Sequence, residues 1–280
     1  MKVYSKTSDL KNVINNVKAQ GKTIGFVPTM GALHNGHISL VNTSEEQCDI
    51  TIVSIFVNPT QFNNIEDLNN YPRTLEEDIK LLEKSTNCDI LFSPSFTDVY
   101  PEDFQKSKLN LGLLENVMEG KHRPGHFEGV VNVVKRLFEI VEPTKAFFGL
   151  KDFQQVAVIK YMTKAFSLPV EIMACPTLRE TSGLAMSSRN QRLSENEKEE
   201  ALIIHKTLLK AKELSSTCTP REVIEKSISF FEKGNLKLEY FEIVNPLTLE
   251  SLDENWTEGS TACIVAYCGE VRLIDNLQLT

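Results

Sequence analysis

Two histidines stand three residues apart in the stretch FVPTMGALHNGHISL, which runs from Phe26 to Leu40. If a helix begins there, His34 and His37 lie on one helical face, where both can donate hydrogen bonds to phosphate oxygens. Gly31 and Gly36 would let the backbone approach a phosphate closely. An imidazolium in this place could stabilise negative charge as it moves onto a departing pyrophosphate. The stretch therefore indicates phosphate chemistry.

Two other interpretations of these histidines stay open at this point. They could be zinc ligands, although HNGH supplies no general-base glutamate and no third ligand is evident. They could also be surface histidines, which is the commoner situation for an isolated pair. The complete string PTMGALHNGH favours the functional interpretation, because the combination is rarely met by chance.

The elements that must position the histidines alternate between strand and helix through about the first 175 residues. Strands are predicted at 23–28, 50–57, 89–94, 145–149 and 170–175, and helices at 8–20, after 74, at 129–141 and at 153–166. Thr74 and Glu77 predict a capping box for the second of these helices. The alternation is typical of βαβ units and a parallel sheet, whose ligands bind at the carboxyl ends of the strands.

The pattern changes after residue 176. Ser194 and Glu197 predict a second capping box and a helix to about Leu214, and Pro220 opens another helix to Lys233. The runs 238–244, 261–268 and 270–275 alternate apolar and polar residues, which predicts a small antiparallel sheet. We therefore predict an α/β fold in two domains. Residues 1–176 form a Rossmann-like, doubly wound parallel sheet, and residues 177–280 form a smaller α+β domain.

Composition narrows the possible functions. The chain has 280 residues, 41% hydrophobic and 24% charged, as in ordinary globular proteins. A net charge of -8 argues against nucleic acid as a partner. No apolar run reaches the roughly 20 residues of a membrane span, and the N-terminus lacks the apolar core of a signal peptide, so a cytoplasmic protein is expected. Six scattered cysteines without a CxxC pair predict buried thiols in a reducing compartment.

Further strings accompany PTMGALHNGH along the chain: FVNPTQF (56–62), YPRT (71–74), RPGHFEGV (123–130), FFGLKDFQQ (147–155) and LAMSSRN (184–190). The first string resembles the nucleotide-binding signature of the class I aminoacyl-tRNA synthetase and nucleotidyltransferase superfamily. Together, and in this order, the strings resemble the pantothenate synthetase family. The resemblance implies that ATP and Mg²⁺ are used to join (R)-pantoate to β-alanine through a pantoyl adenylate, releasing AMP and pyrophosphate. It also implies a homodimer, with residues 1–176 binding nucleotide and pantoate and residues 177–280 acting as a lid.

The resemblance further implies which residues form the ATP site. These are Met30, Gly31, Ala32, Leu33, His34, Asn35, Gly36, His37, Gly149, Leu150, Lys151, Asp152, Leu178, Met186, Ser187, Ser188 and Arg189. His37 would be the proton donor and His34 its partner on the phosphate side. Lys151 would place its ammonium group on the phosphates, and Asp152 would engage the ribose or orient Lys151.

The remaining implied roles concern the substrates and the metal. Gln61 and Gln155 would hold pantoate, and Gln61 would also hold β-alanine. Asp78 is a candidate magnesium ligand, although acidic residues on a helix are usually a solvated face. Leu150 departs from the family, which commonly has a polar or acidic residue at that position.

Ser187, Ser188 and Arg189 stand where class I synthetases carry the KMSKS loop. Ala185 and Ser188 replace the two lysines of that loop, so Lys151 would have to supply the cationic charge. This departure favours the pantothenate synthetase family over a tRNA synthetase.

Two alternatives to this function stay open. A nucleotidyltransferase that adenylates a phosphorylated cofactor precursor would share the HxGH string but would need neither the glutamine motifs nor the second domain. An inactive nucleotide-binding or regulatory module is the other alternative. Intact His34, His37, Lys151, Ser187 and Arg189 count against it.

Overall fold

The computed structural model describes residues 1–280, which form two compact units assembled from separate stretches of the chain. Unit 1 comprises Met1–Leu111, Arg123–Leu150 and Gln155–Pro176. Unit 2 comprises Gly112–His122, Lys151–Gln154 and Thr177–Thr280. One boundary between the units falls after residue 176, where the sequence places the domain boundary. The segments 112–122 and 151–154 belong to unit 2, whereas the sequence analysis assigned them to the first domain.

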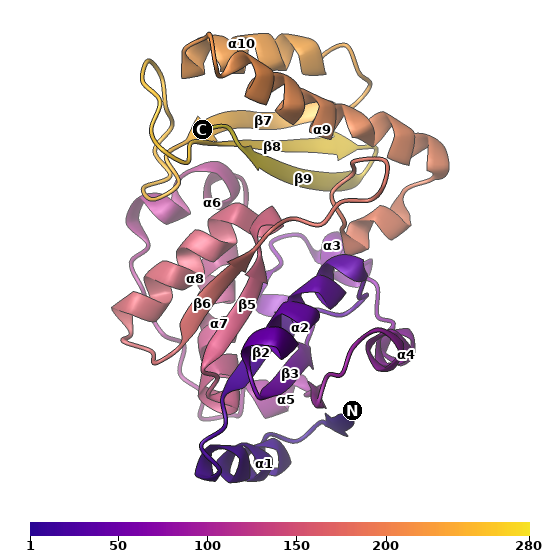
Figure 1. The fold of residues 1–280 in the computed structure, drawn as a ribbon, viewed down its shortest axis with the longest axis vertical. Coiled ribbons are helices and arrows are strands. Elements are labelled where there is room, and N and C mark those ends of the chain that lie inside the picture. Colours follow the sequence, from indigo (N-terminus) through magenta and orange to yellow (C-terminus); the bar gives the residue numbers. More distant parts are fainter. The chain divides into compact units, whose positions relative to one another are not determined.

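Unit 1 is built on a six-stranded parallel sheet in the order β1-β4-β3-β2-β5-β6 (Figure 1). The strands are β1 (Lys2–Tyr4), β2 (Ile24–Thr29), β3 (Ile50–Ile55), β4 (Ile90–Phe92), β5 (Lys145–Gly149) and β6 (Glu171–Cys175). All five pairings between neighbours are parallel. The direction of winding reverses between β2 and β5, which creates a topological switch point at their carboxyl ends. The doubly wound α/β fold predicted from the sequence is confirmed.

Helices cover both faces of this sheet because successive side chains of a buried strand point to opposite sides. Phe26 of β2 packs edge-on against Phe138 with 6.3 Å between ring centroids, whereas Val27 packs with Val41 and Leu82. Phe138 lies on α7, Val41 on α2 and Leu82 on α4. The helices of this part of the chain are α1 (Thr7–Ala19), α2 (Asn35–Gln47), α3 (Ile65–Asn69), α4 (Leu75–Ser85), α5 (Phe96–Val99), α7 (His126–Val141) and α8 (Phe153–Ala165).

Unit 2 contains an antiparallel sheet of β7 (Lys237–Val244), β8 (Thr261–Cys268) and β9 (Val271–Gln278), in that order. Its helices are α6 (Met118–His122), α9 (Glu195–Leu214) and α10 (Pro220–Phe231). One face of the sheet packs Ile264 and Leu273 against Ile204 of α9 and Phe231 of α10. The predicted sheet and both predicted helices are present. Short 3-10 helices occur at η1 (Pro59–Gln61), η2 (Gly112–Glu115), η3 (Leu150–Asp152) and η4 (Ser188–Arg192).

The two predicted capping boxes have different outcomes. Ser194 and Glu197 form one at the start of α9, as expected. Thr74 precedes α4 but makes no capping hydrogen bond, so that prediction is wrong. Its hydroxyl instead donates to the Asp78 carboxylate at 3.3 Å. The hydroxyl is drawn there because Asp78 is buried and gathers donors from several directions.

All six cysteines are free thiols, as the sequence predicted. Cys88, Cys175, Cys263 and Cys268 are buried, whereas Cys48 and Cys218 are half-buried. Burial raises the pKa of Cys88 to about 12, which makes that thiol unreactive near neutral pH.

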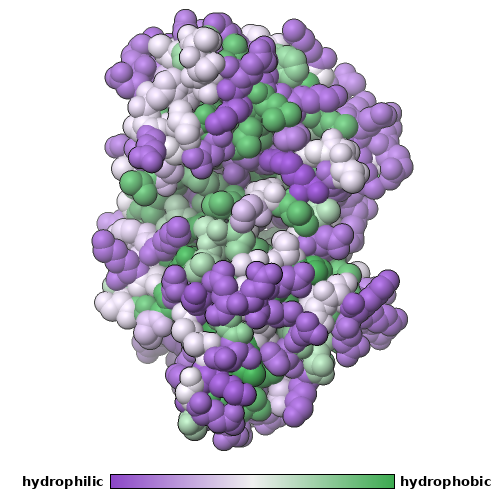
Figure 2. All heavy atoms as spheres, viewed as in Figure 1, coloured by the Kyte–Doolittle hydropathy of each residue, from purple (hydrophilic) through white to green (hydrophobic).

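Hydrophilic residues are spread over most of the face drawn in Figure 2, in keeping with the charged content of the sequence. Among the helices, none combines the length and the apolar character that crossing a membrane requires.

Candidate active site

The loop after β2 leads directly into α2, at the switch point of the unit 1 sheet. His34 is the N-cap residue of α2, and its ring Nδ1 accepts the backbone N–H of Gly36 at 3.1 Å. The ring Nδ1 of His37 accepts the backbone N–H of His34 at 3.3 Å. The two imidazoles consequently lie side by side, with 4.1 Å between ring centroids. The histidines thus cap the helix as well as lining its N-terminus.

These two hydrogen bonds fix the tautomer of both rings. A nitrogen that accepts a backbone N–H carries no proton, so the proton of each neutral imidazole sits on Nε2. In an imidazolium both ring nitrogens donate, so the charged form expected from the sequence would have to give up these two hydrogen bonds. In the arrangement seen here, the neutral ring of each histidine can donate one hydrogen bond from Nε2.

The amides of the loop are directed at a carboxylate of the protein itself. Asp78 on α4 accepts the N–H of Ala32 at 2.9 Å and that of Leu33 at 2.7 Å. The N–H of Gly31 donates to the hydroxyl of Thr29 at 3.2 Å. Successive amides of this kind form an anion-binding concavity, and here the anion is Asp78. The amides of Ala32 and Leu33 thus bind Asp78, and the approach of this loop to a phosphate stays a prediction.

Backbone conformation explains the need for glycine in this loop. Gly31 has φ +82° and Ala32 has φ +48°, both in the left-handed region. A Cβ at position 31 would lie 3.0 Å from Asp78 Oδ2 and 3.0 Å from Ile55 Cγ2. Gly31 is thus required by the turn and by the close approach of Asp78.

Asp78 is only 2% exposed, and burial raises its pKa even though the amides of Leu33 and Ala32 act to lower it. Both of its oxygens already accept hydrogen bonds from the protein. No group of three or more histidine, cysteine, aspartate or glutamate side chains could together hold a metal ion. This environment supports a role for Asp78 in holding the loop, and the magnesium-binding role suggested by the sequence stays a prediction.

Replacing Asp78 by asparagine is expected to loosen the loop. The amide can accept only one of the two backbone N–H groups, so the unfolding free energy should fall by about 1–3 kcal/mol and use of ATP should weaken. Because the folded-state pKa of Asp78 is raised, its carboxyl contributes stability below its unfolded pKa and loses it as the pH rises through the folded value. The advantage of the wild type over Asp78→Asn should therefore be larger at acidic than at neutral pH.

Urea denaturation at several pH values measures this prediction. Glu76→Gln is the matched control, since Glu76 lies on the same helix and is exposed. Equal stability of Asp78→Asn and Glu76→Gln at every pH would contradict the role of Asp78 in the loop.

Gln61 lies beside the histidine loop in unit 1 and is buried. Its side-chain oxygen accepts from Asn58 Nδ2 at 3.3 Å, and its amide nitrogen donates to the sulfur of Met30 at 3.2 Å. The structure thus brings together two of the sequence-predicted residues, Met30 and Gln61, from strings that are separated in the sequence.

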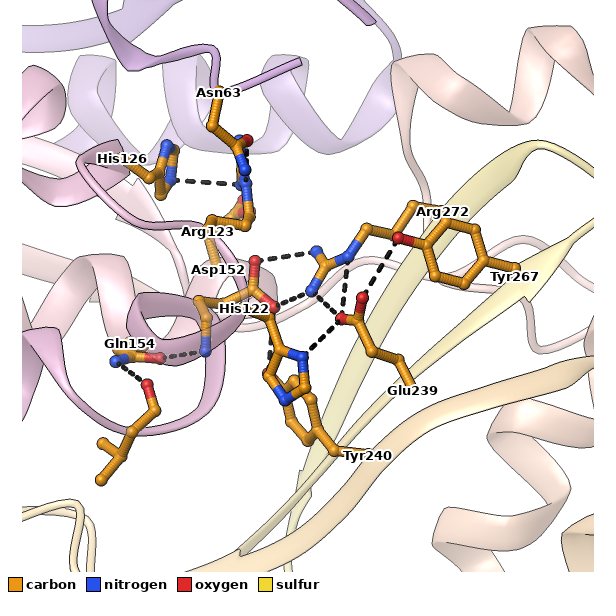
Figure 3. Close-up of polar contacts among 12 residues, drawn as sticks. Asn63, His122, Arg123, His126, Asp152, Gln154, Glu239, Tyr240, Tyr267 and Arg272 are labelled. Carbon is orange, nitrogen blue, oxygen red and sulfur yellow. Dashed lines mark hydrogen bonds and ion pairs between the residues drawn. The ribbon is translucent and has the colours of Figure 1, made fainter.

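The string RPGHFEGV holds Gln61 in place, a role that the sequence alone did not indicate. The ring Nδ1 of His126 hydrogen bonds the carbonyl of Gln61 at 2.7 Å. A Cβ at Gly129 would lie 2.5 Å from the carbonyl oxygen of Thr60, so only glycine allows α7 to approach η1 this closely. Figure 3 shows Arg123 extending toward the ring of His126, 3.2 Å from its Nε2. The motif was visible in the sequence, but its contacts with Gln61 span about 65 residues of chain.

The other predicted residues near β5 are placed as follows. Gly149 ends β5 and Leu150 begins η3, and both are half-buried in unit 1. Gln155 is half-buried on α8. The preceding Gln154 is structural, because its amide donates to the carbonyls of Leu114 and Val117 at 2.8 and 3.0 Å.

The other predicted phosphate-binding residues, Lys151, Ser187, Ser188 and Arg189, lie in unit 2. The ammonium of Lys151 is 3.6 Å from the Asp152 carboxylate, as expected if Asp152 orients it. The hydroxyl of Ser187 accepts the N–H of Arg189 at 3.3 Å and caps η4, in which Ser188 is buried. Leu178 and Met186 face each other across a hairpin, where the N–H of Met186 donates to the carbonyl of Leu178 at 3.0 Å.

Unit 2 contains a partly buried charge network that the sequence did not predict. Arg272 donates to both oxygens of Glu119 at 2.9 and 2.7 Å. It also donates to Glu239 at 3.0 Å (Figure 3). Tyr240 and Tyr267 donate to Glu119 and Glu239 at 3.0 and 3.1 Å. The network ties the segment 112–122 to the antiparallel sheet. Its members are scattered over 153 residues, and no local pattern marks them.

A doubly wound parallel sheet with HNGH at its switch point defines an α/β nucleotide-binding enzyme of the class I synthetase and nucleotidyltransferase type. Comparisons with known proteins narrow this class. The family described as pantoate-beta-alanine ligase matches residues 2–278. A pantothenate synthetase from Porphyromonas gingivalis is 49% identical over 99% of both chains. The chain belongs to the pantoate–β-alanine ligase family.

Solved structures agree with this assignment. The crystal structure of pantothenate synthetase from Thermus thermophilus is 37% identical, with a TM-score of 0.94, over 100% of this chain and 99% of that one. The pantoate–β-alanine ligase of Francisella tularensis, solved in complex with β-γ ATP and β-alanine, is 38% identical with a TM-score of 0.82. That alignment covers 100% of this chain and 98% of the other.

Proposed function

We propose that this enzyme ligates (R)-pantoate to β-alanine through a pantoyl adenylate, with ATP and Mg²⁺. The observation that carries the proposal is the pair of imidazoles, His34 and His37, whose Nδ1 atoms accept backbone N–H groups at the N-terminus of α2, beyond the end of β2. The Francisella tularensis relative, solved with β-γ ATP and β-alanine, supports the same substrates here.

In the first step, a carboxylate oxygen of pantoate attacks the α-phosphorus of ATP. A new oxygen–phosphorus bond forms as the bond to pyrophosphate breaks, and negative charge moves onto the pyrophosphate. Donors that are already aimed at this charge stabilise the transition state without reorganising. His37 and His34 fulfil this condition because backbone amides hold their Nδ1 atoms.

In the second step, the amine of β-alanine attacks the carbonyl carbon of the adenylate. The carbon–oxygen bond to AMP breaks, the nitrogen gives up a proton, and pantothenate is formed. The first step is necessary because a free carboxylate is a poor acyl donor until its oxygen is bonded to a good leaving group.

The remaining residues are proposed to bind and orient. Gln61 and Gln155 hold pantoate. Lys151, oriented by Asp152, contacts the phosphates of ATP together with Ser187, Ser188 and Arg189. Magnesium neutralises phosphate charge when it is bound. Since it usually binds substrate phosphates and water, we propose that it arrives with ATP and does not require Asp78 as a ligand.

The oligomeric state and the cellular compartment are further parts of the proposal, and both follow from the family. We propose that the enzyme is a homodimer, which analytical ultracentrifugation tests directly. We also propose that it works in the cytoplasm, in keeping with six free cysteines and no disulfide.

Isotope exchange between pyrophosphate and ATP tests the proposal, because the first step is reversible. We expect exchange that requires pantoate and magnesium but not β-alanine. A reaction without an adenylate would show exchange only when every substrate is present. A dinucleotide-forming transferase would exchange with a nucleotide-like acceptor and ignore pantoate.

The same assay tests the substrate residues. Gln61→Ala and Gln155→Ala should weaken pantoate binding by about 1–3 kcal/mol each, because buried polar groups of the substrate lose their partners. ATP binding should change little. Gln105→Ala is the control, since Gln105 is exposed in unit 1. Full pantoate-dependent exchange in both variants would refute the substrate assignment even if adenylate formation were demonstrated.

A further inference from the structure

Two neighbouring residues of β9, Asp275 and Asn276, send their side chains to opposite faces of the unit 2 sheet. Leu273, two residues before Asp275, packs in the core with α9 and α10. Because side chains alternate along a strand, Asp275 shares that side with Leu273. Asn276 shares the other side with Arg272 and its partly buried network. Asp275 and Asn276 can therefore contact different segments on the two faces of the sheet.

On the network side, Asn276 holds the backbone of Lys151. Its amide Nδ2 donates to the carbonyl of Lys151 at 2.9 Å. Three residues on, Gln154 accepts the N–H of Glu119 at 2.9 Å, and Glu119 pairs with Arg272 of the same strand. The segment 151–154 is thus held by β9 directly at Lys151 and through Glu119 at Gln154. It belongs to unit 2.

On the other side, Asp275 holds the hairpin that precedes Ser187. Its two oxygens accept from Arg179 at 2.6 and 2.9 Å in a bidentate pair, and Asp275 is buried. Arg179 pairs with Ala185 across the hairpin. The carbonyl of Ala185 in turn accepts from Asn190 Nδ2 at 3.0 Å, which connects the hairpin to η4.

We propose that Asp275 and Asn276 are positioning residues that hold the two phosphate-binding segments of unit 2 on one strand. Asn276 sets the backbone of Lys151, and Asp275 sets the hairpin leading to Ser187 and Arg189. This inference rests on the proposed function, in which those side chains contact the phosphates of ATP. The two anchors are linked directly, because the N–H of Asn276 donates to Asp275 Oδ1 at 2.8 Å.

The expected effect of losing an anchor is on turnover. Small displacements of a charged group from its productive position can cost about 100-fold in rate, so Asn276→Ala should lower kcat by about 10- to 100-fold in pyrophosphate exchange. The KM for pantoate should stay close to the wild-type value, because Gln61 and Gln155 belong to unit 1. Asn276→Asp keeps the size of the side chain but has no N–H to donate, and should behave like Asn276→Ala.

Gln278→Ala is the matched control, since Gln278 is an exposed amide on the same strand. Introducing Asn276→Ala into a Lys151→Ala enzyme distinguishes an effect that acts through Lys151 from a general loss of structure. If Asn276 acts through Lys151, then adding Asn276→Ala to Lys151→Ala should change kcat by less than about twofold. Wild-type kcat in Asn276→Asp and Asn276→Ala, or a full multiplicative effect in the double variant, would overturn the proposal.

Hydrogen exchange gives a readout that does not depend on activity. Asn276→Ala should speed exchange of amides in 151–154 and leave those in 178–186 unchanged, whereas Asp275→Asn should do the reverse. Equal acceleration of both segments by each variant would overturn the assignment of one segment to each residue. If Lys151→Ala kept full activity, the proposed role of Lys151 would fail, and the exchange pattern would still decide whether the two anchors exist.

Discussion

His37→Ala is expected to lower turnover by about 10²- to 10³-fold while changing the affinity for ATP far less. The reason is that the Nε2–H of His37 is held in place before the reaction, by the bond between its Nδ1 and the N–H of His34. A donor of this kind acts mainly on charge that develops in the transition state. Single-turnover measurement of adenylate formation, beside equilibrium binding of ATP, separates the two effects.

Two further variants separate the catalytic role of His37 from its role in capping α2. Asparagine can accept the backbone N–H of His34 but does not reach the position of Nε2, so His37→Asn should be stable and slow. Glutamine can reach that position with an N–H, so His37→Gln should recover part of the rate. Near-normal turnover in His37→Ala, with only a raised KM for ATP, would show that the ring binds ATP and does not promote the reaction.

Arg272→Ala is expected to destabilise unit 2 by about 2–4 kcal/mol, because it leaves two partly buried carboxylates without their cation. Arg272 is the shared partner of Glu119 and Glu239, and all three side chains are less than one-fifth exposed. Burial lowers the pKa of Arg272, but the bonds to Glu119 and Glu239 outweigh burial and raise it. The two carboxylates thus stabilise the guanidinium charge against the cost of burial.

The chain contains a single tryptophan, Trp256, which lies in unit 2 and packs against its core. Its fluorescence during urea denaturation therefore reports the unfolding of that unit. Arg221→Ala is the control, because Arg221 pairs with Asp253 where both side chains are more than half exposed. Exposed pairs contribute little. A midpoint for Arg272→Ala equal to that of Arg221→Ala would contradict the structural importance of the network.

The order of strands and helices was predictable because it depends on local periodicity. Strands such as β2 and β3 are continuous apolar runs, β9 alternates, and β8 is a further apolar run bounded by turns, so both sheets were expected from the sequence. The short strand β1 was not predicted, because three residues carry too little pattern. The Thr74 capping box failed because a tertiary partner, Asp78, competes for the hydroxyl.

Only the short sequence motifs of the site could be predicted, and not the contacts between them. Composition and spacing marked His34 and His37, but not their tautomer, which depends on which backbone amides reach Nδ1. The hydrogen bonds from Ala32 and Leu33 to Asp78 join residues about 45 positions apart. The membership of segments 112–122 and 151–154 in unit 2 likewise depends on contacts with β9, more than 120 residues later for Lys151. Contacts between residues so far apart in the chain cannot be recognised from a single sequence.

The division of the chain into interleaved segments has a consequence for synthesis on the ribosome. Lys151 emerges 125 residues before Asn276, the side chain that holds its backbone. At about 5–20 residues per second, the segment 151–154 waits several seconds or longer without its anchor. A nascent or truncated chain without β9 therefore lacks the side chain that holds the backbone of Lys151, even if the parallel sheet has already folded. If Lys151 contacts ATP as proposed, the enzyme becomes active only once the antiparallel sheet is complete.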